Sequence, residues 1–151
     1  MASGLDRFVA ATTELELVIH EMPQSTHTAQ EAADAVSAPL AAIVKSLVFV
    51  SGDTPVLVLV SGANRADMAV LEAHLQADCR KATADEVKQA TGWSIGGVPP
   101  FGHPVPLRTL MDEDFLALET LWAAAGSADA VFPISPHRLA ELTSADIVRV
   151  S

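Results

Sequence analysis

Cysteine is nearly absent from this sequence: Cys79 is the single thiol among 151 residues. One thiol cannot form an internal disulfide and cannot supply the thiolate cluster of a structural metal site. Arg80 and Lys81 follow Cys79, but no nucleophile motif surrounds it, so we expect this thiol to be inert. The cysteine content is typical of a protein from a reducing compartment.

Long apolar runs are also missing. None approaches the ~20 residues that a membrane-spanning helix needs, although half of the residues are apolar. The first ten residues, MASGLDRFVA, have no basic region followed by an apolar stretch and so do not resemble a secretion signal. We therefore expect a cytoplasmic protein without a membrane partner, folded as one domain over residues 1–151.

Basic residues are scarce, with 9 Lys and Arg against 19 Asp and Glu and a formal charge of −10. This balance argues against a protein that coats nucleic acid by neutralising phosphates. Recognition of one nucleic-acid end stays open, because a few local cations suffice for it. The densest basic group is CRK at 79–81, which is also explained as solvated surface charge.

Familiar catalytic and nucleotide-binding motifs are missing as well. The G-x-S-x-G elbow, the H-E-x-x-H pair, the GxGxxG fingerprint and the P-loop do not occur. The acidic cluster Asp112, Glu113 and Asp114 is typical of the first turn of a helix, where carboxylates suit the helix dipole. The five histidines are scattered and form no ligand pair, so a metal site is not expected; they are His20, His27, His74, His103 and His137.

The remaining pattern is a mixture of amphipathic helices and apolar strands. Capping boxes at Thr28–Glu31 and Thr83–Glu86 each begin a helix, and Gly92 is suited to end the second. Further helices are expected at 3–11, 67–76 and 135–142. Expected strands lie at 15–20, 43–50, 55–60, 103–110, 119–125, 130–134 and 146–150, with SGDT joining the second and third as a hairpin. This order favours a mixed sheet with helices packed on it.

Two features do not fit regular elements. The segment TGWSIGGVPPFGHP at 91–104 holds four glycines and three prolines, so it forms neither a helix nor a central strand, and its main chain is open to close approach by a ligand. Lys45 interrupts the apolar strand AAIVKSLVFV, between Ile43 and Leu47 on one face. It must snorkel, pair with an acid or line a cavity.

Together these segments resemble a known family. QEAADAV, AAIVKSLVFV, PVLVLVSGANRADMAVLEAHL, CRKATADEVKQATGWSIGGVPPFGH and AAGSADAVFPISPHRLAELTSADIV follow in this order. They are similar to the YbaK/EbsC family, the editing domains associated with bacterial prolyl-tRNA synthetases, from about residue 25 to 151. The family implies an α/β fold with a curved, mixed and partly barrel-like sheet surrounded by helices.

The resemblance also implies a reaction and a site. The family hydrolyses the ester that joins a wrong amino acid to the 3′-terminal adenosine of a tRNA, without cofactor or metal. It implies Lys45 as the catalytic residue in a cleft with the substrate-binding loop. The loop positions that match are Gly96, Gly97, Val98, Pro100, Phe101, Gly102 and the adjoining His103. Candidate phosphate contacts are Lys45, Arg80, Lys81 and Arg108.

One segment departs from the pattern. Some members carry a polar or acidic pocket residue after the AG pair, where this chain has Val131 and Phe132 with Ser127 and Asp129 nearby. We expect a freestanding deacylase that removes Ala, Cys, Ser or Thr from tRNA, with a synthetase or an elongation factor as a further partner. The alternatives are an inactive module that binds tRNA, a nucleotide or a protein, and a regulatory domain that binds a small molecule.

Overall fold

The structure is a computed structural model that describes residues 2–22 and 28–151. In these ranges it has five α-helices, eight strands and three short 3-10 helices. The α-helices are α1 (Gly4–Ala11), α2 (Ala29–Val36), α3 (Met68–Leu75), α4 (Ala84–Thr91) and α5 (Pro136–Thr143). The strands are β1 (His20–Glu21), β2 (Val44–Ser51), β3 (Thr54–Ser61), β4 (Cys79–Lys81), β5 (Arg108–Asp112), β6 (Leu121–Ala124), β7 (Ala130–Ile134) and β8 (Asp146–Val148).

The larger sheet is built on the β2–β3 hairpin. Its strand order is β4-β2-β3-β5-β8, in which β2 pairs antiparallel with β3 and β4, and β3–β5 and β5–β8 are parallel. β4 covers only the end of β2, where Phe49 pairs with Lys81 and Ser51 with Cys79. The first half of β2 therefore has β3 on one side and no β4 on the other.

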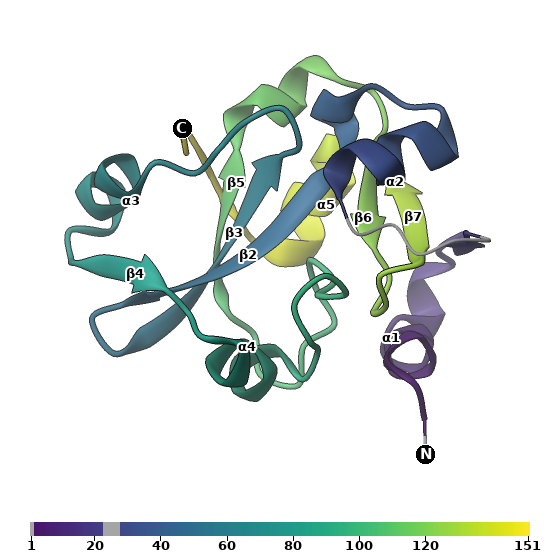
Figure 1. Ribbon diagram of the computed structural model, residues 1–151, viewed down its shortest axis with the longest axis horizontal. Coiled ribbons are helices and arrows are strands. Elements are labelled where there is room, and N and C mark those ends of the chain that lie inside the picture. Colours follow the sequence, from purple (N-terminus) through teal and green to yellow (C-terminus); the bar gives the residue numbers. More distant parts are fainter. Residues whose placement is uncertain (1, 23–27) are drawn as a thin grey trace.

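The smaller sheet has the order β1-β7-β6 and is antiparallel. It lies beside the first half of β2 (Figure 1), where a parallel bridge joins Ile43 to Trp122. The two sheets thus curve around a common interior without closing into a barrel. The expected class, a curved mixed sheet surrounded by helices, is confirmed.

Strand periodicity divides the core between the two faces of the large sheet. Leu57 and Leu59 pack toward β6, β7, α4 and α5, whereas Val56, Val58 and Val60 pack toward α3. A third cluster packs α2 against Ile43 and Trp122. Because both faces of β3 and of the second half of β2 are covered, their central residues, Val56–Val60 and Val48–Val50, are all apolar.

Local capping explains where the helices begin. The Thr83–Glu86 box forms in both directions, and α4 ends at Gly92 with a φ of 85°. At Thr28 only half of the expected box forms, with the Thr28 side chain accepting from the Glu31 amide. Ser3 makes a complete capping box that the sequence reading missed. No helix in the described ranges has both the length and the apolar character needed to cross a membrane.

Several expected strands are shorter than the sequence pattern. Of the strand expected at 15–20, only His20 is in a strand, because Glu16 adopts a left-handed conformation with a φ of 55°. The strand expected at 103–110 begins only at Arg108, since Pro104 and Pro106 lack the amide donors of a ladder. The strand expected at 146–150 ends at Val148. β4 was not predicted.

The acidic cluster does begin a helix, as expected. Glu113–Ala117 form a 3-10 helix, η3, whose N-cap is Asp112. Of the histidines considered as metal ligands, His27 lies outside the described residues.

Candidate functional site

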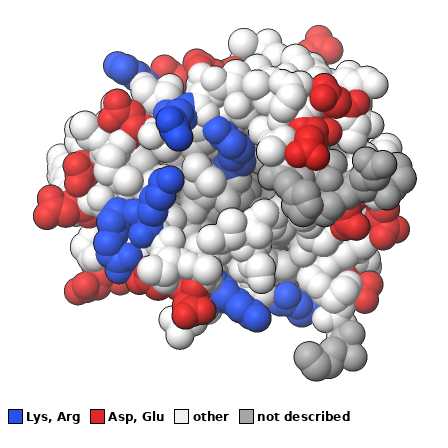
Figure 2. Space-filling model, viewed as in Figure 1, with Lys and Arg blue, Asp and Glu red and all other residues white. Residues whose placement is uncertain are grey.

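A cavity of about 410 Å³ lies where β2 diverges from β4 and β6. Its walls come from β2, the end of β4, α2, α4, the Gly-Pro loop (residues 91–104) and the β6–β7 turn. Figure 2 shows a hollow in this face, with basic side chains around it and acidic side chains mostly toward the margin. The apolar lining is broken by few polar side chains, an arrangement typical of small-molecule sites.

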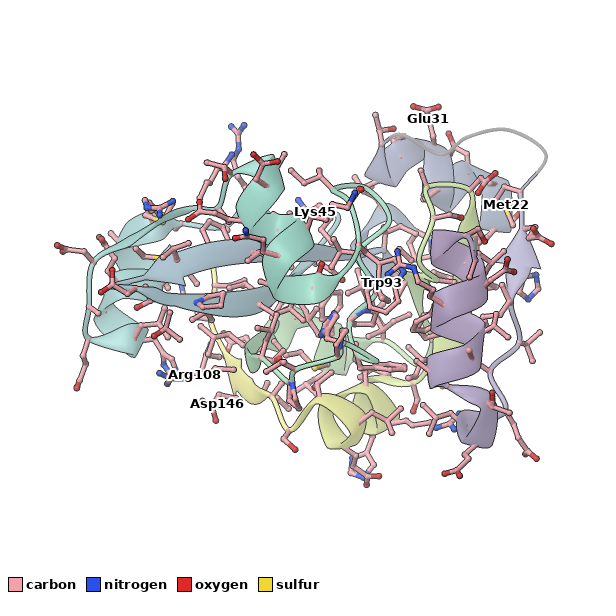
Figure 3. The ribbon with its side chains drawn as sticks, turned by 90° about the horizontal axis from the view of Figure 1, so that it is seen from below. Met22, Glu31, Lys45, Trp93, Arg108 and Asp146 are labelled. Atoms are coloured by element: carbon pink, nitrogen blue, oxygen red, sulfur yellow. The ribbon has the colours of Figure 1, made fainter. Side chains whose placement is uncertain are left out.

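Lys45 contributes a cation to the cavity wall from β2. Its Nζ donates a hydrogen bond to the carbonyl oxygen of Asn64, in the loop after β3. In Figure 3 Lys45 lies on the side of β2 that faces α4 and α2. Burial lowers the pKa of the ammonium; the positive charge of Arg65 lowers it further, and the negative charge of Asp112 raises it. Lys45 thus lines a cavity and is neither free in solvent nor directly ion-paired within the described ranges.

The first half of the Gly-Pro loop faces the cavity. Ile95, Gly96 and Val98 line it, and Ile95 is 65% exposed at its mouth. Gly96 has a φ of 93° with open space where a Cβ would stand, so its main chain is accessible. Gly97 is directed the other way: a Cβ there would lie 2.9 Å from Cα of Ser127. The loop is therefore packed tightly against the β6–β7 turn.

The second half of the loop belongs to the interior. Phe101 packs between Phe8 and Phe132, and neither it nor the buried Pro100 is among the cavity-lining residues. Gly102 instead borders a groove beside residues 10–15. His103 contacts the Trp93 ring and places Nε2 2.8 Å from the Pro99 carbonyl oxygen. Burial lowers its pKa, which that hydrogen bond partly opposes.

Another part of the cavity wall contains the segment that departs from the family pattern. Val131 and Ser127 line the cavity, whereas Phe132 is fully buried in the core. Asp129 is exposed and accepts a 2.7 Å hydrogen bond from the Ser127 hydroxyl. Ser127 is thus the polar group of this segment that faces the site.

Ser46 was missed by the sequence reading. It lines the cavity, and its Oγ is buried without a hydrogen-bond partner in the described part of the chain. The Val48 carbonyl accepts a hydrogen bond from the Ala82 amide, so the main-chain groups of Val48 point away from β3. Ser46 lies two residues earlier on the same strand, so its amide and carbonyl point to the same side as those of Val48. One position thereby presents a hydroxyl, an amide and a carbonyl toward the cavity. The sequence signal was a small polar residue in an apolar strand.

Only some of the proposed phosphate contacts are available there. Lys81 lines the cavity with Lys45. Arg80 instead makes two 2.8 Å hydrogen bonds to Glu86, a pairing that lowers the pKa of that carboxyl to about 2. Arg108 lies on the far side of β2 and β3 beside Asp146 (Figure 3), 3.7 Å from its carboxylate.

Comparisons with known proteins identify the family of this chain. The family model described as "Aminoacyl-tRNA editing domain" matches residues 23–142. The protein YwhH of Bacillus subtilis, which has no assigned function, is 29% identical over 83% of this chain and 80% of its own length. The proline–tRNA ligase of Lactobacillus johnsonii is 30% identical over 85% of this chain, but only 23% of the ligase is covered.

The fold itself is found in solved structures. A crystal structure reported as that of "a putative trans-editing enzyme for prolyl tRNA synthetase" superposes with a TM-score of 0.94. It is 41% identical, and the match covers 100% of this chain and 98% of the other. With the family model matching most of the sequence and the superposition matching all of it, the chain belongs to the family of aminoacyl-tRNA editing domains.

Proposed function

We propose that this protein is a freestanding aminoacyl-tRNA deacylase that hydrolyses the ester of mischarged tRNA. The observation that carries the proposal is a cation, Lys45, facing an apolar cavity whose rim includes the accessible main chain at Gly96. The match of the whole chain to a structure reported as a trans-editing enzyme supports action on tRNA charged by another protein. A prolyl-tRNA synthetase is the partner that the ligase relatives favour.

Hydrolysis of an aminoacyl ester needs few catalytic groups from the protein. Water adds to the ester carbonyl carbon, the bond to the ribose oxygen breaks, and that oxygen takes up the proton while the amino acid leaves as its acid. An aminoacyl ester is activated, so fixing it and stabilising the oxyanion supply most of the catalysis. We assign the oxyanion or the neighbouring phosphate to Lys45, and main-chain contacts to the loop at Gly96. A hydroxyl of the terminal ribose is the group that would activate the water.

The cavity supports small amino acids as substrates. About 410 Å³ is within the range of sites that hold one small ligand. Val131, Ala124 and Ile43 line it with apolar groups, and Ser46 and Ser127 add hydroxyls. Ala, Cys, Ser and Thr esters match this combination of size and polarity.

The hydroxyl of Ser46 gives a test of substrate class. Ser46→Ala should reduce deacylation of Ser-tRNA more than that of Ala-tRNA, because only the former offers a side-chain partner for the buried oxygen. A neutral hydrogen bond contributes about 1 kcal/mol, so the ratio of the two rates should change roughly fivefold. Single-turnover rates on both charged tRNAs measure it. An unchanged ratio would assign Ser46 to another part of the substrate.

Activity itself is tested on a panel of tRNAs mischarged with Ala, Cys, Ser or Thr. Release of the amino acid from at least one of them, above the uncatalysed rate, is the expected result. Binding of the tRNAs without hydrolysis would favour the alternative of an inactive binding module.

Because few cations lie at the cavity, tRNA binding should depend only weakly on salt concentration. Lys45 and Lys81 at the cavity, with the exposed Arg65 nearby, should neutralise about two or three phosphates and set the slope of log affinity against log salt. Lys81→Gln should lower this slope by about one. Arg108→Gln, a matched charge removal on the far side of the sheet, should leave it unchanged. Equal effects of both variants would contradict the assignment of the cavity face as the one that binds the tRNA phosphates.

A further inference from the structure

Asp112 is a buried acid that the proposed reaction does not use. It ends β5 and is only 1% exposed. One carboxylate oxygen accepts from the amide of Asp114 at 3.0 Å. The other accepts from the amide of Ser61 at 3.0 Å and from Nδ2 of Asn64 at 2.9 Å. The acid thus connects the end of β5 to the loop after β3.

Asn64 carries this connection to the cavity. Its side-chain amide donates to Asp112 and, at 2.7 Å, to Asp114, so both amide hydrogens have carboxylate acceptors. Its main-chain carbonyl accepts the hydrogen bond from Nζ of Lys45. The residue that orients the ammonium is therefore itself oriented by two acids.

The same loop is fixed from its other side. The Ser61 hydroxyl donates to the Ala41 carbonyl at 2.8 Å and accepts from the Ala63 amide. Gly62 passes so close to Leu40 that a Cβ would lie 3.2 Å from the Leu40 side chain. The carbonyl of Asn64 is consequently held by contacts that leave it little freedom to move.

We infer that Asp112, acting through Asn64, is a positioning residue that holds the Lys45 ammonium at the cavity wall. The inference rests on the proposed function for its catalytic consequence only. Among the described residues, two charges act on Lys45: Arg65 in the β3–α3 loop and Asp112 at the end of β5. The carboxylate of Asp114 in η3 contacts the Asn64 side chain. Lys81 of β4 lines the same cavity.

The sign of the effect follows from these charges. The negative charge of Asp112 raises the pKa of Lys45 against the lowering by burial and by Arg65. Asp112→Asn removes that charge, so the pKa of Lys45 should fall, and the loss of activity at alkaline pH should begin at lower pH. Arg65→Gln removes a positive charge, so the loss of activity at alkaline pH should begin at higher pH. Glu113→Gln removes an exposed acid beside Asp112 and should change neither the pKa of Lys45 nor the pH at which activity is lost.

The pKa can be read without substrate, because the chain has only three lysines, Lys45, Lys81 and Lys88. In protein labelled with ¹³C-lysine, the Cε shifts are followed with pH, and Lys45→Arg assigns its signal. The expected result is a lower pKa for Lys45 in Asp112→Asn, an unchanged one in Glu113→Gln, and deacylation reduced on the order of tenfold at neutral pH in Asp112→Asn alone. A Lys45 titration identical in the parent and Asp112→Asn would overturn the inference.

A second variant covers failure of Asp112→Asn to fold. Asn64→Ala keeps the carbonyl that accepts from Lys45 but removes both side-chain anchors, and should reduce deacylation with little change in KM. Unchanged rates with Asn64→Ala would also overturn the inference. If the parent protein hydrolyses no mischarged tRNA while its Lys45 pKa still depends on Asp112, the proposed function fails and the positioning role stands.

Discussion

Replacing Lys45 with alanine is expected to slow deacylation by about a hundredfold or more while the protein stays folded. Loss of one preorganised electrostatic group at a reacting carbonyl typically costs this much. The structure places this ammonium in the wall of the cavity, already fixed by the Asn64 carbonyl. Single-turnover hydrolysis and the midpoint of thermal unfolding should be measured on the same preparation.

The stability of Lys45→Ala should change by no more than about 1 kcal/mol. The variant loses one hydrogen bond, to Asn64, but it also removes a charge whose pKa burial has lowered, so the two effects oppose one another. Asp112 is a buried acid whose negative charge acts on Lys45. That acid nevertheless has three other hydrogen-bond donors and is not left unpaired when Lys45 is removed.

Lys45→Arg is the informative companion. A guanidinium keeps the charge but is planar and larger than an ammonium, so it should restore only part of the rate. Full activity of Lys45→Ala together with a lowered unfolding midpoint would assign Lys45 to the fold and refute its catalytic role.

Local rules predicted the elements whose geometry depends on neighbours in sequence. The β2–β3 hairpin follows from two apolar runs around a Gly-Asp turn, and it forms with Ser51 paired to Thr54. The α4 helix follows from its capping box and from Gly92. The position of Lys45 on an apolar strand was enough to predict that its ammonium needs a cavity, an acid or a path to solvent.

Residues whose role depends on tertiary contacts were harder to assign. The sequence predicts Asp112 in the first turn of a helix. The structure places it one position earlier, at the N-cap, and its second oxygen anchors Asn64, forty-eight positions earlier in the chain. The Gly-Pro loop was read as a single substrate-binding unit. In the second half of the loop, Phe101 instead packs against Phe8 and Phe132. The loop has no helix or strand periodicity, so the sequence does not indicate which half is buried.

A glycine next to the cavity should be the most sensitive backbone position. Gly126 has a φ of 98°, and a Cβ there would lie 2.9 Å from both the Gly4 carbonyl carbon and Nε1 of Trp93. That Nε1 donates to the Gly4 carbonyl at 2.8 Å, so α1, the Gly-Pro loop and the β6–β7 turn meet at this point. The neighbouring Ser127 lines the cavity. An added methyl group must therefore displace the backbone that positions one cavity wall.

Gly126→Ala is accordingly expected to lower the free energy of unfolding by about 3 kcal/mol or more, the sum of a left-handed conformation and an overpacked contact. Gly52→Ala is the matched control, because Gly52 also has positive φ, 61°, but open space where a Cβ would stand. It should lose only about 1 kcal/mol, from conformation alone. Urea unfolding of the two variants against the parent measures the difference. Equal losses would show that the three segments separate without cost, and that the cavity wall at Ser127 is not held by this contact.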